Sequence, residues 1–182
     1  MQAGKTTIAI IGGTGALGAG LARHLARAGH AIVIGSRSAE KADAAAQALA
    51  VSGGTVKPRG TGNADAAKAA EIVFVTVPWA NHAAILDEIA PHVAGKLVVD
   101  TTVPLVPPRV ARVQMPPEGS AALAAQKRLG TGVRVVSAFH NVAAHKLQKV
   151  SFALGPASSS TSRLRQGQGH SVLVCLRTAS AS

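Results

Sequence analysis

The fold of this chain is decided by the stretch IIGGTGALGAG at residues 10–20. Within it, residues 13–18 match the G-x-G-x-x-G turn that binds the diphosphate of a dinucleotide. The β-branched run at residues 6–11 predicts a buried strand before the turn, and leucines at helical spacing predict a helix after it. This order of strand, turn and helix is the context that the dinucleotide motif requires, so we favour it over an ordinary glycine turn.

Each glycine of the motif has a separate expected role. Gly13 permits the tight turn, Gly15 lets the backbone approach a diphosphate, and Gly18 lets the helix pack closely on the strand. The start of the helix then directs its free N–H groups at the anion. We therefore expect a phosphate site at this turn.

The tip of the second predicted strand, residues 31–34, indicates which cofactor is bound. NAD-dependent enzymes place an acid there to bond the ribose 2′-hydroxyl, and this chain has Gly35, Ser36 and Arg37 instead. A hydroxyl and a guanidinium can both donate to a phosphate, and Lys41 lies one helical turn beyond. The sequence therefore predicts NADP rather than NAD; the alternative is that Arg37 and Lys41 are only solvated surface charges.

Strands and helices alternate along the rest of the chain, joined by short connections. We expect further strands at residues 71–77, 96–101 and 133–139, with a short one near Val56. We expect helices at residues 17–28, 38–49, 65–70, 81–93 and 120–129. This alternation predicts an α/β fold with a doubly wound parallel sheet, the Rossmann architecture, rather than a sandwich or a helix bundle.

The pattern changes after about residue 154. Residues 155–169 are rich in Ser, Gly, Gln and Arg without apolar periodicity, and residues 171–176 form one short apolar patch. We therefore predict an NADP-binding Rossmann domain at residues 1–150 and an irregular basic tail at residues 151–182.

Composition and charge argue against several classes of protein. The single cysteine, Cys175, cannot form an intrachain disulfide or a multi-cysteine metal site, which favours a cytoplasmic chain. Glycines within residues 12–20 interrupt the apolar run of a signal peptide, and no stretch has the about 18 apolar residues of a membrane span.

The net charge of the chain, +11, is unevenly distributed: residues 1–118 contribute +3, and residues 119–182, which contain no acid, contribute +8. Without interleaved aromatic residues or a basic helix, this charge does not predict nucleic-acid binding.

Several more candidate residues follow the ends of predicted strands, where open α/β sheets bind their ligands. Pro78 and Trp79 end the most hydrophobic strand, and the indole could line the cofactor pocket or simply pack. His82 could shape the same cleft or be a surface histidine, and Val103 ends the next strand. His140 follows the last strand and could contact a second bound ring or be a plain loop histidine.

Groups for hydrolytic chemistry are not visible in the sequence. We find no Ser-His-Asp set, paired carboxylates or metal-ligand cluster, and therefore expect no catalytic protein residue and no metal. Hydride transfer needs no such groups, because two cofactors held face to face carry the chemistry themselves. The sequence therefore favours an oxidoreductase.

Four segments of the chain carry a family resemblance: IIGGTGALGAGLARHLARAGHAIVIGSRSAEKA, VTVPWANH, DTTVPLVPP and VVSAFHNVAAHKL. Together they resemble the F420-dependent NADP oxidoreductases over about residues 5–150. The resemblance implies a reversible hydride transfer between NADP(H) and the deazaflavin coenzyme F420, with no obligatory protein acid or base.

The resemblance also implies which residues contact the cofactors. The diphosphate would be held by Thr14, Gly15, Ala16 and Leu17. The 2′-phosphate would be held by Ser36, Arg37 and Lys41. The rest of the nucleotide would be held by Trp79, His82 and Val103, beside Pro78 at the end of its strand. The place where deazaflavin and nicotinamide meet would be lined by His140, Ala143 and Ala144.

The resemblance ends at about residue 150. Members of the family continue into a small helical C-terminal domain that completes the deazaflavin pocket and a homodimer, and the tail here does not resemble it. We expect that domain to be truncated or altered. Two alternatives therefore stay open: an NADP-binding module without activity, and an NADPH-dependent dehydrogenase of a small keto or hydroxy acid, for whose catalytic lysine we find no place.

Overall fold

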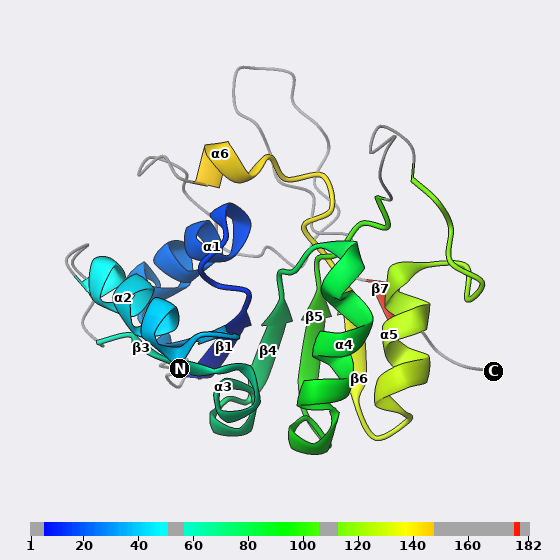
Figure 1. The fold of residues 1–182 in the computed structure, drawn as a ribbon, viewed down its shortest axis with the longest axis horizontal. Helices are drawn as coiled ribbons and strands as arrows, with labels where there is room; N and C mark the ends of the chain where they lie inside the picture. The colour runs from blue at the N-terminus through cyan, green and yellow to red at the C-terminus, as the bar shows by residue number, and fades with distance from the viewer. Residues whose placement is uncertain (1–5, 51–56, 106–112, 148–176, 179–182) are drawn as a thin grey trace, which may run out of the picture.

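The computed structural model describes residues 6–50, 57–105, 113–147 and 177–178, which form alternating strands and helices (Figure 1). The strands are β1 (Thr7–Ile11), β2 (Ala31–Ser36), β3 (Arg59–Gly62), β4 (Ile72–Val75), β5 (Leu97–Asp100), β6 (Arg134–Ser137) and β7 (Arg177–Thr178). The helices are α1 (Ala16–Arg27), α2 (Ala39–Ala50), α3 (Asn63–Ala69), α4 (Trp79–Ile89), the 3-10 turn η1 (Ala90–His92), α5 (Ala121–Leu129) and α6 (Ala144–Leu147).

The sheet extends in both directions from the neighbouring strands β1 and β4, in the order β3-β2-β1-β4-β5-β6-β7 (Figure 1). Strands β1 to β6 are parallel, and β7 pairs with β6 antiparallel. The carboxyl ends of the six parallel strands therefore meet at one edge. The direction of winding reverses between β1 and β4, which is where open α/β sheets bind their ligands.

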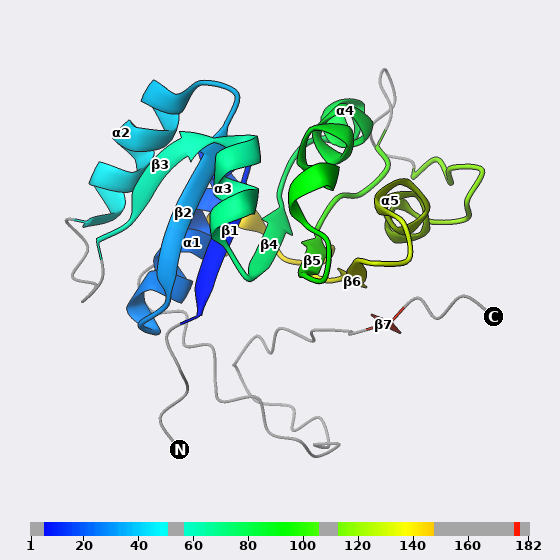
Figure 2. The same ribbon diagram turned by 90° about the horizontal axis from the view of Figure 1, so that it is seen from below.

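Apolar side chains fill the space on both faces of the sheet. Successive residues of a strand point to opposite faces, so Ile8 and Ile10 pack with α1 and α2, while Ala9 and Ile11 pack with α3, α4 and α5. Figure 2 shows α4 and α5 on the same side of β5 and β6. Burial on both faces explains why the strand sequences are apolar throughout. The predicted α/β fold with a doubly wound parallel sheet is confirmed.

Strand β3 differs most from the sequence prediction. The short strand predicted near Val56 lies outside the described residues, and β3 occupies Arg59–Gly62 instead. Its sequence Arg-Gly-Thr-Gly lacks the β-branched run that indicates a strand. Gly60 is needed there because a Cβ at this position would collide with the backbone of Ala42 in α2. Packing against α2, rather than strand propensity, therefore fixes β3.

The predicted basic tail lies outside the described residues except at Arg177 and Thr178, which form β7. The division into residues 1–150 and 151–182 therefore stays a prediction. Among the described residues, no helix is long and apolar enough to cross a membrane.

Candidate cofactor-binding site

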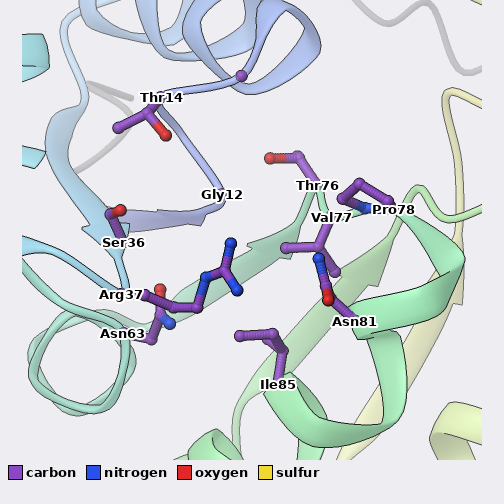
Figure 3. A pocket seen from close by; sticks show the side chains of 11 residues that line it. Gly12, Thr14, Ser36, Arg37, Asn63, Thr76, Val77, Pro78, Asn81 and Ile85 are labelled. Atoms are coloured by element: carbon purple, nitrogen blue, oxygen red, sulfur yellow. The ribbon is translucent and has the colours of Figure 1, made fainter. Parts of the chain in front are cut away.

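A pocket lies at the carboxyl edge of the sheet, where the winding reverses (Figure 3). It is open to solvent and has a volume of about 180 Å³. It is lined by Gly12, Thr14, Gly15, Ser36, Arg37, Asn63, Thr76, Val77, Pro78, Asn81 and Ile85. Arg37 is the charged residue in this lining, and no Asp or Glu belongs to it. The pocket therefore suits a ligand that carries negative charge.

The turn after β1 has no room for side chains at three of its glycines. Gly12 has a φ of +78°, and a Cβ there would lie 2.7 Å from the carbonyl oxygen of Thr76. A Cβ on Gly13 would lie 2.8 Å from the backbone of β1, and one on Gly18 would lie 2.6 Å from Thr76 Oγ1. Gly15 differs, because its Cβ would approach only one backbone oxygen, at 3.3 Å. The left-handed backbone is thus at Gly12, one residue before the glycine predicted to permit the turn.

Helix α1 begins at this turn without a side-chain cap. Its N-cap residue, Gly15, donates its N–H to the Gly12 carbonyl oxygen at 2.9 Å, and its first turn contains no acid. Thr14, Gly15 and Ala16 are exposed, whereas Leu17 packs at the margin of the core. The start of a helix carries partial positive charge and commonly binds phosphate groups. This geometry supports the phosphate site predicted at residues 13–18.

Ser36 and Arg37 stand together at the end of β2, one strand away from the glycine turn. Ser36 Oγ accepts the N–H of Ser38 at 3.3 Å. Arg37 is exposed, and its side chain extends across the pocket (Figure 3). Within the described part of the chain, Arg37 has no ion-pair partner, so its guanidinium is available to a phosphate. Lys41 is exposed in the first turn of α2 and does not belong to the pocket lining.

Pro78 lines the pocket, whereas Trp79 and His82 do not. His82 is 2% exposed, and its Nε2 lies 2.9 Å from Oδ2 of the fully buried Asp100. Asp100 Oδ1 accepts the N–H of Thr102 at 3.0 Å. The indole of Trp79 stacks on the His82 ring with centroids 5.1 Å apart and an interplanar angle of 28°. The alternative that His82 is a surface histidine is therefore wrong. Its Nε2 is already hydrogen-bonded to the Asp100 carboxylate.

The remaining predicted contacts also lie outside this pocket. Val103 is half-buried after β5, and His140 is exposed after β6, with a ring nitrogen 3.4 Å from the Ser137 hydroxyl. Ala143 is half-buried, and Ala144 begins α6, a short helix that the sequence did not indicate. Their contact with a cofactor stays a prediction.

Six lining residues were not predicted from the sequence: Gly12, Asn63, Thr76, Val77, Asn81 and Ile85. Thr76 and Val77 directly follow β4, so the rule that ligands bind at carboxyl ends of strands could have identified them. Asn81 and Ile85 are four residues apart and therefore share one face of α4. Asn63 could be found only once β3 was placed correctly.

The sequence pattern of one protein family, described as "NADP oxidoreductase coenzyme F420-dependent", matches residues 7–104. The chain belongs to this family. Among curated relatives, the F420-dependent NADP reductase of Methanothermobacter marburgensis is 40% identical over 146 residues, covering 77% of this chain and 65% of that protein. The F420-dependent NADP reductase of Methanocaldococcus jannaschii is 39% identical over 142 residues, covering 74% of this chain and 63% of that protein. The chain thus spans just under two thirds of the length of these relatives.

Solved structures agree with this membership of the F420-dependent NADP oxidoreductase family. A crystal structure from Arthrobacter sp. FB24, provisionally named an F420-dependent NADP-reductase, superposes with a TM-score of 0.64 at 27% identity. The superposition covers 77% of this chain and 64% of that one. The relationship therefore extends over more of the chain than residues 7–104, which match the family pattern.

The different environments of Gly15 and Gly18 lead to a prediction about the turn. Gly18→Ala is expected to lower the free energy of unfolding by about 1–3 kcal/mol, because the added methyl group would overlap Thr76 Oγ1 and the Gly12 backbone. Gly15→Ala should lower stability less, since its Cβ would meet one backbone oxygen at 3.3 Å, and it should weaken dinucleotide binding because this residue lines the pocket. Thermal unfolding and calorimetric titration would measure the two effects. Equal losses of stability in both variants would contradict the separate roles.

Proposed function

We propose that this chain binds NADP(H) and transfers a hydride between NADP(H) and the deazaflavin coenzyme F420. The observation that carries the proposal is the pairing of two anion-binding groups in one pocket. The glycine turn at the start of α1 suits a diphosphate. Ser36 and Arg37, which has no ion-pair partner among the described residues, suit a 2′-phosphate one strand away. Their positions match the two charged parts of a single NADP molecule.

The protein's own contribution is binding and orientation. Thr14 and Gly15 would hold the diphosphate, Ser36, Arg37 and Lys41 the 2′-phosphate, and Pro78 the adjoining part of the nucleotide. The cofactors supply the hydride chemistry when they are bound. Because no Asp or Glu is among the described residues that line the pocket, none of these residues would repel the phosphates there.

Support for coenzyme F420 as the second substrate comes from the family to which the chain belongs. We place the meeting point of deazaflavin and nicotinamide near His140, Ala143 and Ala144, at the carboxyl end of β6. Trp79, His82 and Val103 would shape the nicotinamide side without lining the described pocket. We also propose that the protein is cytoplasmic and forms a homodimer. Light scattering during size-exclusion chromatography would measure the mass of the assembly and so test the dimer.

Titration of the purified chain with NADPH and separately with NADH tests the cofactor part of the proposal. NADPH is expected to bind at least about tenfold more tightly, the effect of one or two charge-assisted hydrogen bonds to the 2′-phosphate. Addition of oxidised coenzyme F420 should then oxidise one NADPH for each deazaflavin reduced. Equal affinity for NADPH and NADH would contradict the role of Ser36 and Arg37.

The same experiment separates the alternatives. NADPH binding without reduction of the deazaflavin would favour an NADP-binding module. NADPH oxidation by small keto acids, with none by coenzyme F420, would favour a dehydrogenase.

A further inference from the structure

Asn63 has a buried side-chain oxygen with no hydrogen-bond partner. The residue follows β3, lines the pocket and is 1% exposed. Its Nδ2 donates to Glu88 Oε2 at 3.1 Å, while its Oδ1 has no partner within the described residues. Because a carboxylate only accepts, the contact with Glu88 fixes which amide atom is the nitrogen. The atom left over is therefore an acceptor, and a ligand that donates to it would remove the cost of an unsatisfied buried group.

The register of the sheet places Asn63 beyond the phosphate-binding groups. The glycine turn follows β1, Ser36 ends β2 opposite Gly62 of β3, and Asn63 comes next in the chain. Asn63 Oδ1 lies 3.3 Å from the position of a Cβ built on Gly35, which puts it against the tip of β2. Diphosphate, ribose and base follow one another in the same order within NADP. This order places Asn63 at the base.

The opposite side of the pocket is suited to a flat ring. Val77 and Ile85 present apolar side chains there, and the Arg37 side chain crosses the space between them and β3 (Figure 3). An aromatic base can lie against these apolar side chains, which leaves the guanidinium free to pair with the 2′-phosphate. Arg37 has no ion-pair partner within the described residues, so it can move to the ligand without breaking a salt bridge.

We propose that Asn63 Oδ1 accepts a hydrogen bond from the 6-amino group of adenine, so that the site recognises the base as well as the 2′-phosphate. The phosphates of NADP only accept hydrogen bonds, and the ribose hydroxyls lie on the phosphate side of the base, so the 6-amino group is the donor that NADP presents beyond them. Glu88 has the positioning role, because its contact with Nδ2 keeps Oδ1 directed away from α4. The proposal rests on the proposed function, that is, on NADP(H) as the ligand.

The test compares NADPH with deamino-NADPH, in which a carbonyl oxygen replaces the adenine amino group. The unsubstituted chain is expected to bind deamino-NADPH about tenfold more weakly, because two acceptors would face each other. Asn63→Ala should bind NADPH about fivefold more weakly and bring the affinity ratio of the two cofactors close to one. Asn81→Ala, which removes the other asparagine of the pocket, should keep the ratio.

A second variant covers the case in which Asn63→Ala does not fold, as judged by circular dichroism. Glu88→Ala leaves Asn63 in place but frees its amide to rotate, and it should lower the preference for NADPH over deamino-NADPH at least threefold.

Equal affinities of the unsubstituted chain for these two cofactors would overturn the inference. If NADPH were still preferred over NADH in that case, the proposed function would stand, whereas no binding of NADPH would overturn both. Loss of the ratio in Asn81→Ala alone would assign the base to α4 and overturn the role of Asn63.

Discussion

Asp100→Ala is expected to lower the free energy of unfolding by about 2–5 kcal/mol, the cost of leaving buried hydrogen-bond donors without their acceptor. Asp100 is fully buried and accepts hydrogen bonds through both carboxylate oxygens, from His82 Nε2 and from the Thr102 N–H. Its removal leaves two buried donors without an acceptor, and the carboxyl end of β5 loses its connection to α4. Urea denaturation followed by circular dichroism would measure the change.

An exposed aspartate provides the matched control. Asp87 lies on the same helix as His82 and pairs with Arg128 through both oxygens, at 2.8 and 2.9 Å. Both side chains of this pair are exposed, at 59% and 43%, so Asp87→Ala should cost less than about 1 kcal/mol. Equal losses in the two variants would mean that the buried pair contributes no more than a surface ion pair.

The fluorescence of Trp79 gives a local readout for the same pair. Trp79 is the single tryptophan of the chain, and its ring stacks on His82. Loss of Asp100 should therefore change its emission in the folded state, whereas Asp87→Ala should not.

The strand, glycine turn and helix at residues 7–27 could be predicted because their sequence requirements are local. Gly13 lies against the backbone of Ile10, and Gly18 lies against the backbone of Gly12 and Gly13, all within one turn. The leucines that follow need only helical spacing. Ser36 and Arg37 were identified for a related reason, since they lie at the carboxyl end of a strand that the sequence clearly predicts. Each of these features is determined by a few neighbouring residues.

Asn63 and the His82–Asp100 pair could not be predicted in this way because they depend on distant parts of the chain. Asn63 belongs to the site only through the pairing of β3 with β2, and β3 has no strand-like sequence. His82 looks like a surface residue until the register of β4 and β5 brings Asp100 beneath α4. In both cases the sequence shows the residue type, and tertiary packing decides its role.

Arg37→Ala is expected to weaken NADPH binding by about 1.5–3 kcal/mol, the range for a hydrogen bond to a charged group, and to leave NADH binding nearly unchanged. The reason is that Arg37 is the charged side chain of the pocket, and a 2′-phosphate is the part of NADPH that NADH lacks. Calorimetric titration with both cofactors would measure the difference. Lys41→Ala should cost less, below about 1 kcal/mol, because this second candidate cation for the 2′-phosphate is exposed and lies outside the pocket lining.

The comparison between cofactors distinguishes two ways in which Arg37 could act. A loss confined to NADPH means that the guanidinium pairs with the 2′-phosphate, as its position at the end of β2 suggests. An equal loss for NADH would mean that Arg37 acts on a group common to both cofactors, such as the adenine ring lying between it and Ile85. In that case Ser36 and Lys41 would be left as the residues that select NADPH, and the loss in Lys41→Ala should then exceed that expected of a surface charge.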